Sequence, residues 1–115
     1  MNNVLIGSLG ENLAKEFLLN KNYEILDTNV RFSHYCELDI VAKKKNTLVF
    51  VEVKTRKNAN FGLPSEAVTP TKYNNIKKGI YFYLSEKNIK YDRYQIDVIS
   101  IVLKPVLKIE HLENI

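Results

Sequence analysis

Apolar residues recur at helical spacing in two stretches of the chain, near its start and again after residue 70. The first stripe consists of Ile6, Leu9, Leu13 and Phe17, and the second of Tyr73, Ile76, Ile80 and Leu84. Apolar positions three or four residues apart lie on one face of a helix. The pattern therefore predicts amphipathic helices over about residues 4–20 and from Pro70 to about Lys87, with Thr69 as the N-cap of the second.

Between and after these helices, short runs of β-branched and aromatic residues predict strands. The expected strands cover residues 23–32, 37–43, 47–55, 94–102 and 105–112. The first is interrupted near Asp27-Thr28-Asn29, and the last begins at Pro105, which suits an edge strand. Only Lys44-Lys45-Asn46 separates the second strand from the third, so these two are expected to form an antiparallel hairpin. Residues 57–70 contain Asn, Gly and two prolines and are expected to form a loop.

The resulting order is α-β-β-β-α-β with a further strand at the end, which predicts an α/β domain with a mixed sheet flanked by helices. Residues 1–115 are expected to form a single domain, because no repeat or Pro/Gly/Ser-rich linker divides them. No signal peptide is expected, and no apolar run is long enough to span a bilayer. The single cysteine, Cys36, excludes an internal disulfide, so we expect a cytoplasmic protein without a membrane partner.

The predicted hairpin brings acidic and basic residues together. If it turns on Lys45-Asn46, its register places Asp39 directly opposite Glu52. The same register places Glu37 opposite Lys54. Facing side chains on an antiparallel pair have Cβ atoms roughly 4.5–5.5 Å apart. Two carboxylates at that distance repel each other unless a proton or a cation lies between them.

A divalent metal ion is one explanation of this arrangement. Hard oxygen ligands favour Mg²⁺ or Mn²⁺ over zinc. Asp39 and Glu52 would bind the ion, the backbone carbonyl of Val53 could complete the set, and Lys54 would bind the scissile phosphate or orient the attacking water. The alternative is a solvated strand pair in which Glu37 and Lys54 form a cross-strand ion pair. From the residues alone, the two interpretations have similar weight.

Several other charged or polar residues have both a structural and a functional interpretation. Glu11 borders the apolar stripe of the first helix, and by periodicity a solvated role is favoured for it. Asp97 lies on the opposite face of its strand from Ile96 and Val98, and a structural hydrogen-bonding role is favoured over a role behind the site. Lys72 borders the second helical stripe and could approach a phosphate, although most such lysines extend to water. Neither histidine, His34 nor His111, has metal-ligand spacing, and both are interpreted as ordinary polar residues.

The chain carries a modest net positive charge. The formal net charge is +4 and the isoelectric point is near 9.1, which suits a polyanionic partner such as DNA. Many small basic proteins bind no nucleic acid, so the charge supports a nucleic-acid partner without establishing one.

The spacing Asp39…Glu52-Val53-Lys54 resembles the D-(x)n-E-x-K signature of the restriction-endonuclease-like superfamily, often written PD-(D/E)xK. With Glu11 on a preceding helix, the set looks like the Holliday junction resolvase branch. More closely, the chain resembles the YraN-like family of small uncharacterised bacterial proteins. The segments that carry this resemblance are Gly7-x-x-Gly10-Glu11-x-x-Ala14, Glu37-Leu38-Asp39-Ile40-Val41, Val49-Phe50-Val51-Glu52-Val53-Lys54-Thr55-Arg56, Phe61-Gly62-x-Pro64-x-Glu66-Ala67-Val68, Lys72 and Asp97-Val98.

The resemblance implies a restriction-endonuclease-like fold with the acids on a central hairpin. It implies that Asp39, Glu52 and Lys54 form the metal and phosphate site, with Glu11 as a further ligand. Candidate nucleic-acid contacts are Arg56, Lys72 and Arg31. The chain departs from the family pattern at two places. Cys36 stands where a glycine is expected, and Gln95-Ile96 stands where an arginine and an aromatic residue are usual.

The leading hypothesis from the sequence is a Mg²⁺- or Mn²⁺-dependent nuclease that acts on DNA, including branched or damaged DNA. The first alternative is a non-catalytic nucleic-acid-binding or scaffold module on the same fold. The second is a purely structural interaction protein in which the acids form salt bridges. A small domain of this kind would often need a second copy to grip a duplex, so a homodimer is plausible.

Overall fold

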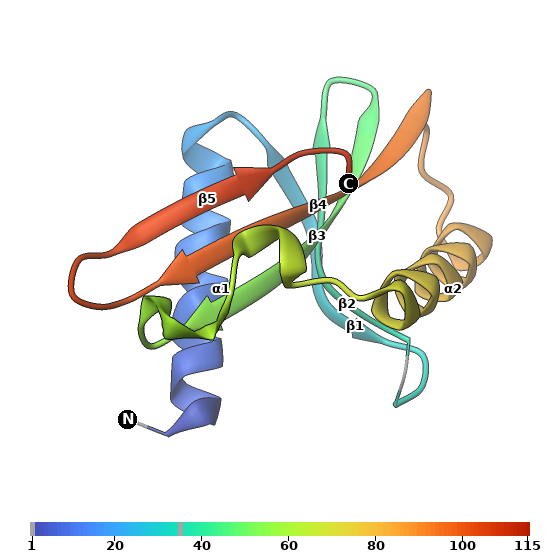
Figure 1. Cartoon of the computed structure of the whole chain (residues 1–115). Coiled ribbons are helices and arrows are strands. Elements are labelled where there is room, and N and C mark those ends of the chain that lie inside the picture. The colour runs from blue at the N-terminus through green and yellow to red at the C-terminus, as the bar shows by residue number, and fades with distance from the viewer. Residues whose placement is uncertain (1, 35) are drawn as a thin grey trace.

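The computed structural model describes residues 2–34 and 36–115, and Met1 and Tyr35 lie outside the described residues. Its elements run in the predicted order, α-β-β-β-α-β-β (Figure 1). The helices and strands are α1 (Asn3–Asn20), β1 (Glu24–Arg31), β2 (Glu37–Lys44), β3 (Thr47–Arg56), α2 (Pro70–Glu86), β4 (Arg93–Val102) and β5 (Lys108–Leu112). Two short 3-10 turns, η1 (Ala59–Phe61) and η2 (Pro64–Glu66), lie in the segment expected to be a loop.

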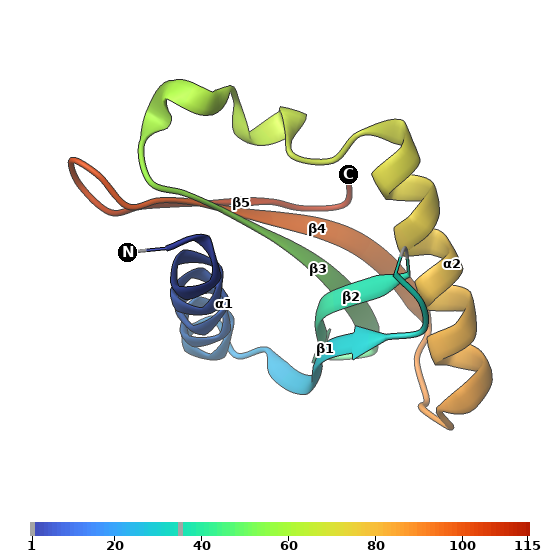
Figure 2. The ribbon, with the colours of Figure 1, turned by 90° about the horizontal axis from the view of Figure 1, so that it is seen from below.

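The five strands form one mixed sheet in the order β1-β2-β3-β4-β5. Every neighbouring pair is antiparallel except β3 and β4, which run parallel because α2 connects them as a crossover. The sheet is strongly twisted, so that β1 and β2 curl away from the plane of β3, β4 and β5 (Figure 2). The α/β class and the mixed sheet predicted from the sequence are confirmed.

The two helices lie on opposite sides of this sheet (Figure 2). Side chains of β3 alternate between them: Val49 and Val51 join the core under α1, whereas Leu48 and Phe50 join the core under α2. A strand that is buried on both faces has no polar alternation, which explains the continuous apolar run at the start of β3. This central position fixes the orientation of the charged residues that follow on the same strand.

Helix α1 approaches β3 very closely at Gly10. A Cβ atom built on Gly10 would overlap Oγ1 of Thr55 and would lie 2.7 Å from the Cβ of that threonine. Neither atom of the short threonine side chain can move far, so only glycine fits at this crossing. The contact holds the next residue of the helix, Glu11, beside the sheet.

Helix α2 begins as predicted. Oγ1 of Thr69 accepts a hydrogen bond from the backbone N–H of Lys72 at 3.1 Å, and Pro70 occupies the first turn. Further along, the buried Tyr83 donates its hydroxyl to Asp27 of β1 at 2.7 Å. Burial, reinforced by this bond, raises the pKa of Tyr83. The second bond ties the C-terminal part of α2 to the sheet.

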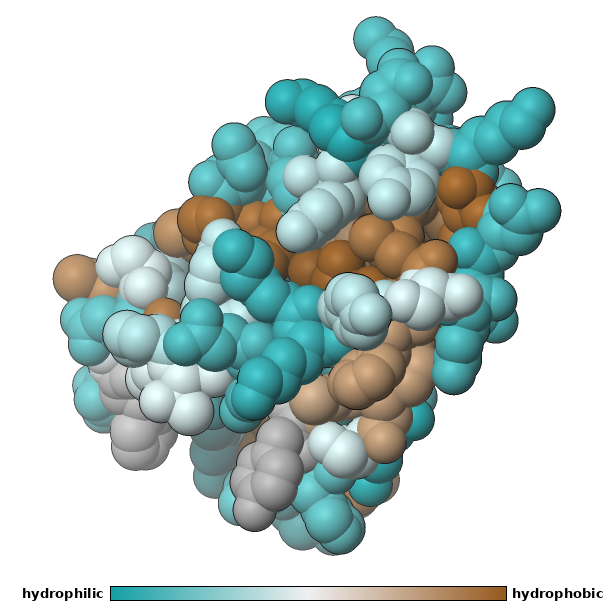
Figure 3. Space-filling view, turned by 90° about the vertical axis from the view of Figure 1, so that its right-hand side faces the viewer, coloured by the Kyte–Doolittle hydropathy of each residue, from teal (hydrophilic) through white to brown (hydrophobic). Residues whose placement is uncertain are grey.

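The outer surface on the side of α2 is hydrophilic around a band of apolar residues (Figure 3). On α2 itself, Tyr81 and Phe82 are exposed, and the ring of Phe82 packs against Phe32 with centroids 5.6 Å apart. Among residues 2–34 and 36–115, no helix has the length and apolarity needed to cross a membrane.

Two strand boundaries differ from the prediction. Strand β1 is continuous, and the expected interruption is instead a shift of register between Ile25 and Asp27 against β2. The prediction that the last strand begins at Pro105 is wrong. Strand β5 begins at Lys108, and Pro105 lies in the connection from β4, because a proline cannot donate the ladder hydrogen bond that the first pairs of β5 require.

Replacing Gly10 by alanine is expected to lower the free energy of unfolding by about 2–3 kcal/mol, because the added methyl group collides with Thr55. Gly7→Ala on the same helix is the matched control. Apart from its chain neighbours and the backbone of its own helix, no atom of the described residues lies within 4 Å of the position of its Cβ, so this change should be neutral or stabilise the helix by about 0.5–1 kcal/mol. Urea denaturation of both variants measures the difference, and equal stabilities would contradict the close packing of α1 on β3.

Candidate functional site

The site lies where β2 separates from β3. The two strands pair from Lys44–Thr47 to Ile40–Val51, in the register predicted for the hairpin. Beyond Ile40–Val51 the regular pairing ends, and the next two residues in that register are Asp39 and Glu52. The predicted hairpin register is therefore confirmed, and the two carboxylates stand at the point of divergence.

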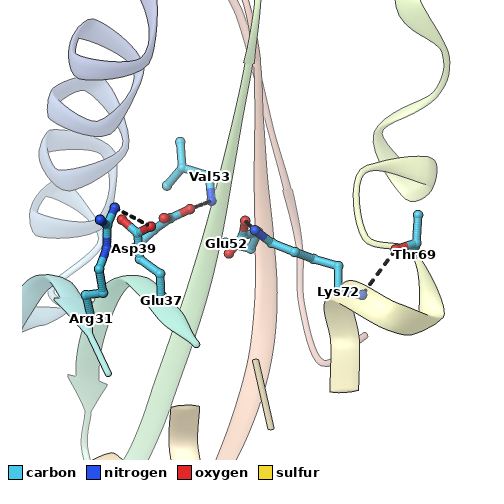
Figure 4. Close-up of polar contacts among 7 residues, drawn as sticks. All are labelled: Arg31, Glu37, Asp39, Glu52, Val53, Thr69 and Lys72. Carbon is cyan, nitrogen blue, oxygen red and sulfur yellow. Dashed lines mark hydrogen bonds and ion pairs between the residues drawn. The ribbon is translucent and has the colours of Figure 1, made fainter. Parts of the chain in front are cut away.

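At this point the side chain of Asp39, rather than the backbone of a neighbouring strand, is the hydrogen-bond partner of β3. Its Oδ2 accepts a hydrogen bond from the backbone N–H of Val53 at 2.9 Å (Figure 4). The N–H and C=O groups of one strand residue point to the same side, so the carbonyl of Val53 also faces the gap rather than β4. The structure thus places the Asp39 carboxylate, the Glu52 carboxylate and this carbonyl around the same opening.

Both carboxyl groups have perturbed protonation. Burial and then the charge of Glu52 raise the pKa of Asp39 to about 8, against the opposing effect of the Val53 N–H. Burial also raises the pKa of Glu52, and the neighbouring Lys72 opposes that rise. Both acids therefore ionise less readily than exposed carboxyl groups, and a cation beside them favours ionisation, as Lys72 does at Glu52.

Helix α1 adds a third carboxylate. The charge of Glu11 contributes to the raised pKa of Asp39, and both residues line one open cleft of about 860 Å³. The carboxylates of Glu11, Asp39 and Glu52 do not all lie within 4.8 Å of one another. Glu11 would therefore reach an ion bound by the other two acids through a different rotamer or a bridging water.

The end of β3 lines the same cleft. Lys54 is exposed there, and Arg56 is 8% exposed. Besides these two basic residues, the lining comprises Asn3, Ile6, Gly7, Glu11, Asp39, Glu52, Val53, Thr55, Lys57 and Asn58. A separate pocket of about 420 Å³ is lined, among the described residues, by no charged side chain. Glu11, Asp39, Glu52 and Lys54 therefore share the larger cleft.

The remaining basic candidates occupy different positions. Lys72 reaches from α2 to Glu52, with Nζ 3.1 Å from Oε1. Burial lowers the pKa of Lys72, but the charge of Glu52, the hydrogen bond to it and the charges of Asp39 and Glu37 together outweigh burial, and the pKa lies above its usual value. Arg31 lies 3.1 Å from Glu37 on the exposed part of the β1–β2 pair. Glu37 thus bonds to Arg31 and not to Lys54, the partner considered for it in the solvated alternative.

One polar cluster was not predicted from the sequence. The fully buried Asp97 accepts hydrogen bonds from the side chain of Gln95 and the backbone N–H of Asn114, each at 2.9 Å. Its other oxygen lies 2.7 Å from Nε2 of His111, whose side chain is itself buried, and Glu113 completes a group of ligand atoms within 4.8 Å. The structural interpretation of Asp97 fits these bonds. No sequence signal marked His111, because its partner lies on a different strand.

The donor set at the strand divergence fits Mg²⁺ or Mn²⁺. All candidate ligand atoms are oxygens: the carboxylates of Asp39 and Glu52, the Val53 carbonyl, and Glu11 at longer range. Hard divalent ions prefer such ligands, and an ion there would favour the ionised carboxylates that burial disfavours.

Fold and site together define a small single-domain α/β protein of the restriction-endonuclease-like type, with its acids on the central hairpin. The chain belongs to the uncharacterised protein family UPF0102, whose sequence profile matches residues 10–101. This confirms the family resemblance drawn from the sequence. The matched region contains Glu11, Asp39, Glu52, Lys54 and Lys72.

Curated relatives match along nearly the whole chain. A UPF0102 protein of Dictyoglomus turgidum is 43% identical and covers 99% of this chain and 98% of its own. A UPF0102 protein of Syntrophomonas wolfei is 43% identical over 95% of both chains. One from Caldicellulosiruptor bescii is 46% identical over 90% of this chain and 87% of its own. These names give the family and no activity.

The raised pKa of Asp39 predicts a pH-dependent stability in metal-free protein. The ordinary carboxyl pKa of 3.8 applies to the unfolded chain, whereas the folded value is about 8. Between about pH 4 and pH 8 the folded state therefore holds a proton that the unfolded state has lost, and the free energy of unfolding falls as pH rises. Asp39→Asn removes this titration while its amide oxygen can still accept from Val53. We expect it to raise the free energy of unfolding at pH 8 by about 1–2 kcal/mol.

Urea denaturation in EDTA at several pH values between 4 and 8 measures this effect. Glu24→Gln, an exposed change on β1, is the control and should leave the pH dependence unaltered. Parallel stability curves for native protein and Asp39→Asn would show that Asp39 does not hold the proton.

Proposed function

We propose that this protein is a divalent-metal-dependent nuclease that hydrolyses phosphodiester bonds in DNA, with branched or damaged DNA among its substrates. The observation that carries the proposal is the pair of acids at the strand divergence, Asp39 and Glu52, both with raised pKa values and both beside Lys54 in an open cleft. Structural acids are normally placed so that they ionise easily, whereas burial makes both of these acids harder to ionise even though Lys72 lies beside Glu52.

Each residue of the site would have its own role in the reaction. Asp39, Glu52 and the Val53 carbonyl would hold Mg²⁺ or Mn²⁺, with Glu11 as an outer ligand. The bound ion would lower the pKa of a water molecule and polarise the phosphate. Lys54 stabilises the charge that develops on the phosphate oxygens and helps to orient or deprotonate the attacking water.

Nucleic-acid binding would use the basic residues around the cleft. Arg56 lies in the cleft wall, Lys72 contacts the cleft residue Glu52 from α2, and Arg31 of β1 pairs with Glu37 outside the cleft lining. Contacts of this kind bind the phosphate backbone without reading sequence. The net charge of +4 supports the same partner. We place the protein in the cytoplasm, acting as a homodimer on duplex substrates so that two copies contact the two strands.

A second candidate function is non-catalytic nucleic-acid binding on the same fold. The ion pair between Lys72 and Glu52 favours it, because it neutralises one acid without a metal. Binding would then be salt-dependent and independent of divalent ions.

Cleavage assays on single-stranded, duplex and four-way-junction DNA test the nuclease. We expect cleavage that requires Mg²⁺ or Mn²⁺ and stops with EDTA. Glu52→Gln and Lys54→Ala should each lower the rate by about 100-fold or more, because the first removes a carboxylate that would hold the ion and the second removes the charge that stabilises the reacting phosphate.

Lys90→Ala provides the control, because Lys90 is exposed before β4 and outside the cleft lining. Its cleavage rate should equal that of the native protein. Activity that survives both Glu52→Gln and Lys54→Ala would refute the mechanism, and metal-independent binding without cleavage would favour the second candidate.

A further inference from the structure

Lys72 occupies an unusual place for a lysine. Its backbone lies in the first turn of α2, where its N–H donates to Thr69 Oγ1, and its side chain extends across to Glu52 (Figure 4). The positive end of the helix dipole disfavours a cation in the first turn, and that turn contains no acidic residue. Helix stability therefore does not account for Lys72, and the 3.1 Å contact with Glu52 does.

The two partners differ in exposure. The side chain of Glu52 is 11% exposed, whereas that of Lys72 is 46% exposed. The acid is thus fixed in the floor of the site, while the lysine can rotate into water on its flexible four-carbon stem. The backbone of Lys72 would not move, because the N-cap bond from Thr69 holds it.

The ammonium group would compete with a metal ion for the same carboxylate. Nζ of Lys72 lies against Oε1 of Glu52, one of the two carboxylates that would bind the ion. A divalent ion between Asp39 and Glu52 would repel an ammonium group in this position. Ion and ammonium therefore cannot both neutralise Glu52 at short range.

We propose that Lys72 and the divalent ion exchange on Glu52: the ammonium neutralises Glu52 while no ion is bound, and it turns to a DNA phosphate when the ion binds. The inference rests on the proposed function and adds a specific role for Lys72. Lys54 has a different role, because it comes from β3 and lies in the cleft lining.

The exchange couples metal to DNA. A phosphate at the ion would lie within reach of the released ammonium, since Lys72 remains anchored beside Glu52. A charge-assisted hydrogen bond from Lys72 to that phosphate would replace its lost interaction with the Glu52 carboxylate. By linkage, the metal ion strengthens DNA binding, and DNA strengthens metal binding.

Calorimetric titration with Mn²⁺ at pH 8 tests the exchange. Lys72→Met keeps the apolar stem and removes the charge, and we expect it to bind Mn²⁺ about tenfold more tightly than the native protein. Lys72→Arg keeps the charge and should remain close to native. Lys78→Met, an exposed lysine on the same helix, is the matched control and should leave the affinity unchanged. Thermal unfolding checks that each variant is folded.

Fluorescence anisotropy with a short DNA duplex supplies a second measurement. Ca²⁺ binds oxygen ligands and serves as the metal here, with EDTA as the comparison. Lys72→Met should weaken DNA binding by about fivefold in Ca²⁺ and leave it unchanged in EDTA, where Glu52 holds the lysine. An equal loss in both conditions would overturn the exchange.

The outcomes separate this inference from the proposed function. Equal Mn²⁺ affinities for native protein and Lys72→Met, together with lost binding in Asp39→Asn, would overturn the exchange and leave the metal site standing. An absence of Mn²⁺ uptake by the native protein, Lys72→Met and Lys78→Met would overturn both.

Discussion

The hydrogen bond from the Val53 amide to the Asp39 carboxylate is the constraint on which the site depends. Strands β2 and β3 must separate at this point, because β2 curls with β1 toward one side while β3 continues beside β4 (Figure 2). The separation would leave the amide of Val53 without a partner in the half-buried interior. Asp39 satisfies it, and in doing so its carboxylate becomes fixed beside Glu52.

The helices convert this local arrangement into a cleft with two differently charged sides. Through the Gly10–Thr55 contact, α1 lies so close to β3 that Glu11 adds negative charge from one side. Through the N-cap at Thr69, α2 directs Lys72 at the site from the other side. Close packing at Gly10 positions α1, whereas the apolar core and the bonds of Lys72 and Tyr83 to the sheet position α2.

The register of the hairpin was predictable because side chains on strands alternate strictly and the connection is only a few residues long. Residue spacing alone was therefore enough to bring Asp39 opposite Glu52. The end of the pairing at Ile40–Val51 was not predictable, because it follows from the twist of the whole sheet. The burial of His111 was hidden for a similar reason, since Asp97 meets it across strands β4 and β5. Lys72 was a candidate contact, but its partner depended on the direction of α2.

The charge state of the site argues that it was not arranged for stability. Burial and mutual repulsion keep the pKa of Asp39 near 8. The buried Asp97 is a structural acid in the same fold. Each of its carboxylate oxygens has a hydrogen-bond partner. Asp39 has the Val53 amide on one oxygen, and an acid instead of a base as its nearest charged neighbour. The sheet thus gives both oxygens of Asp97 polar partners, whereas burial beside Glu52 favours the protonated form of Asp39, and Lys72 offsets the charge of Glu52.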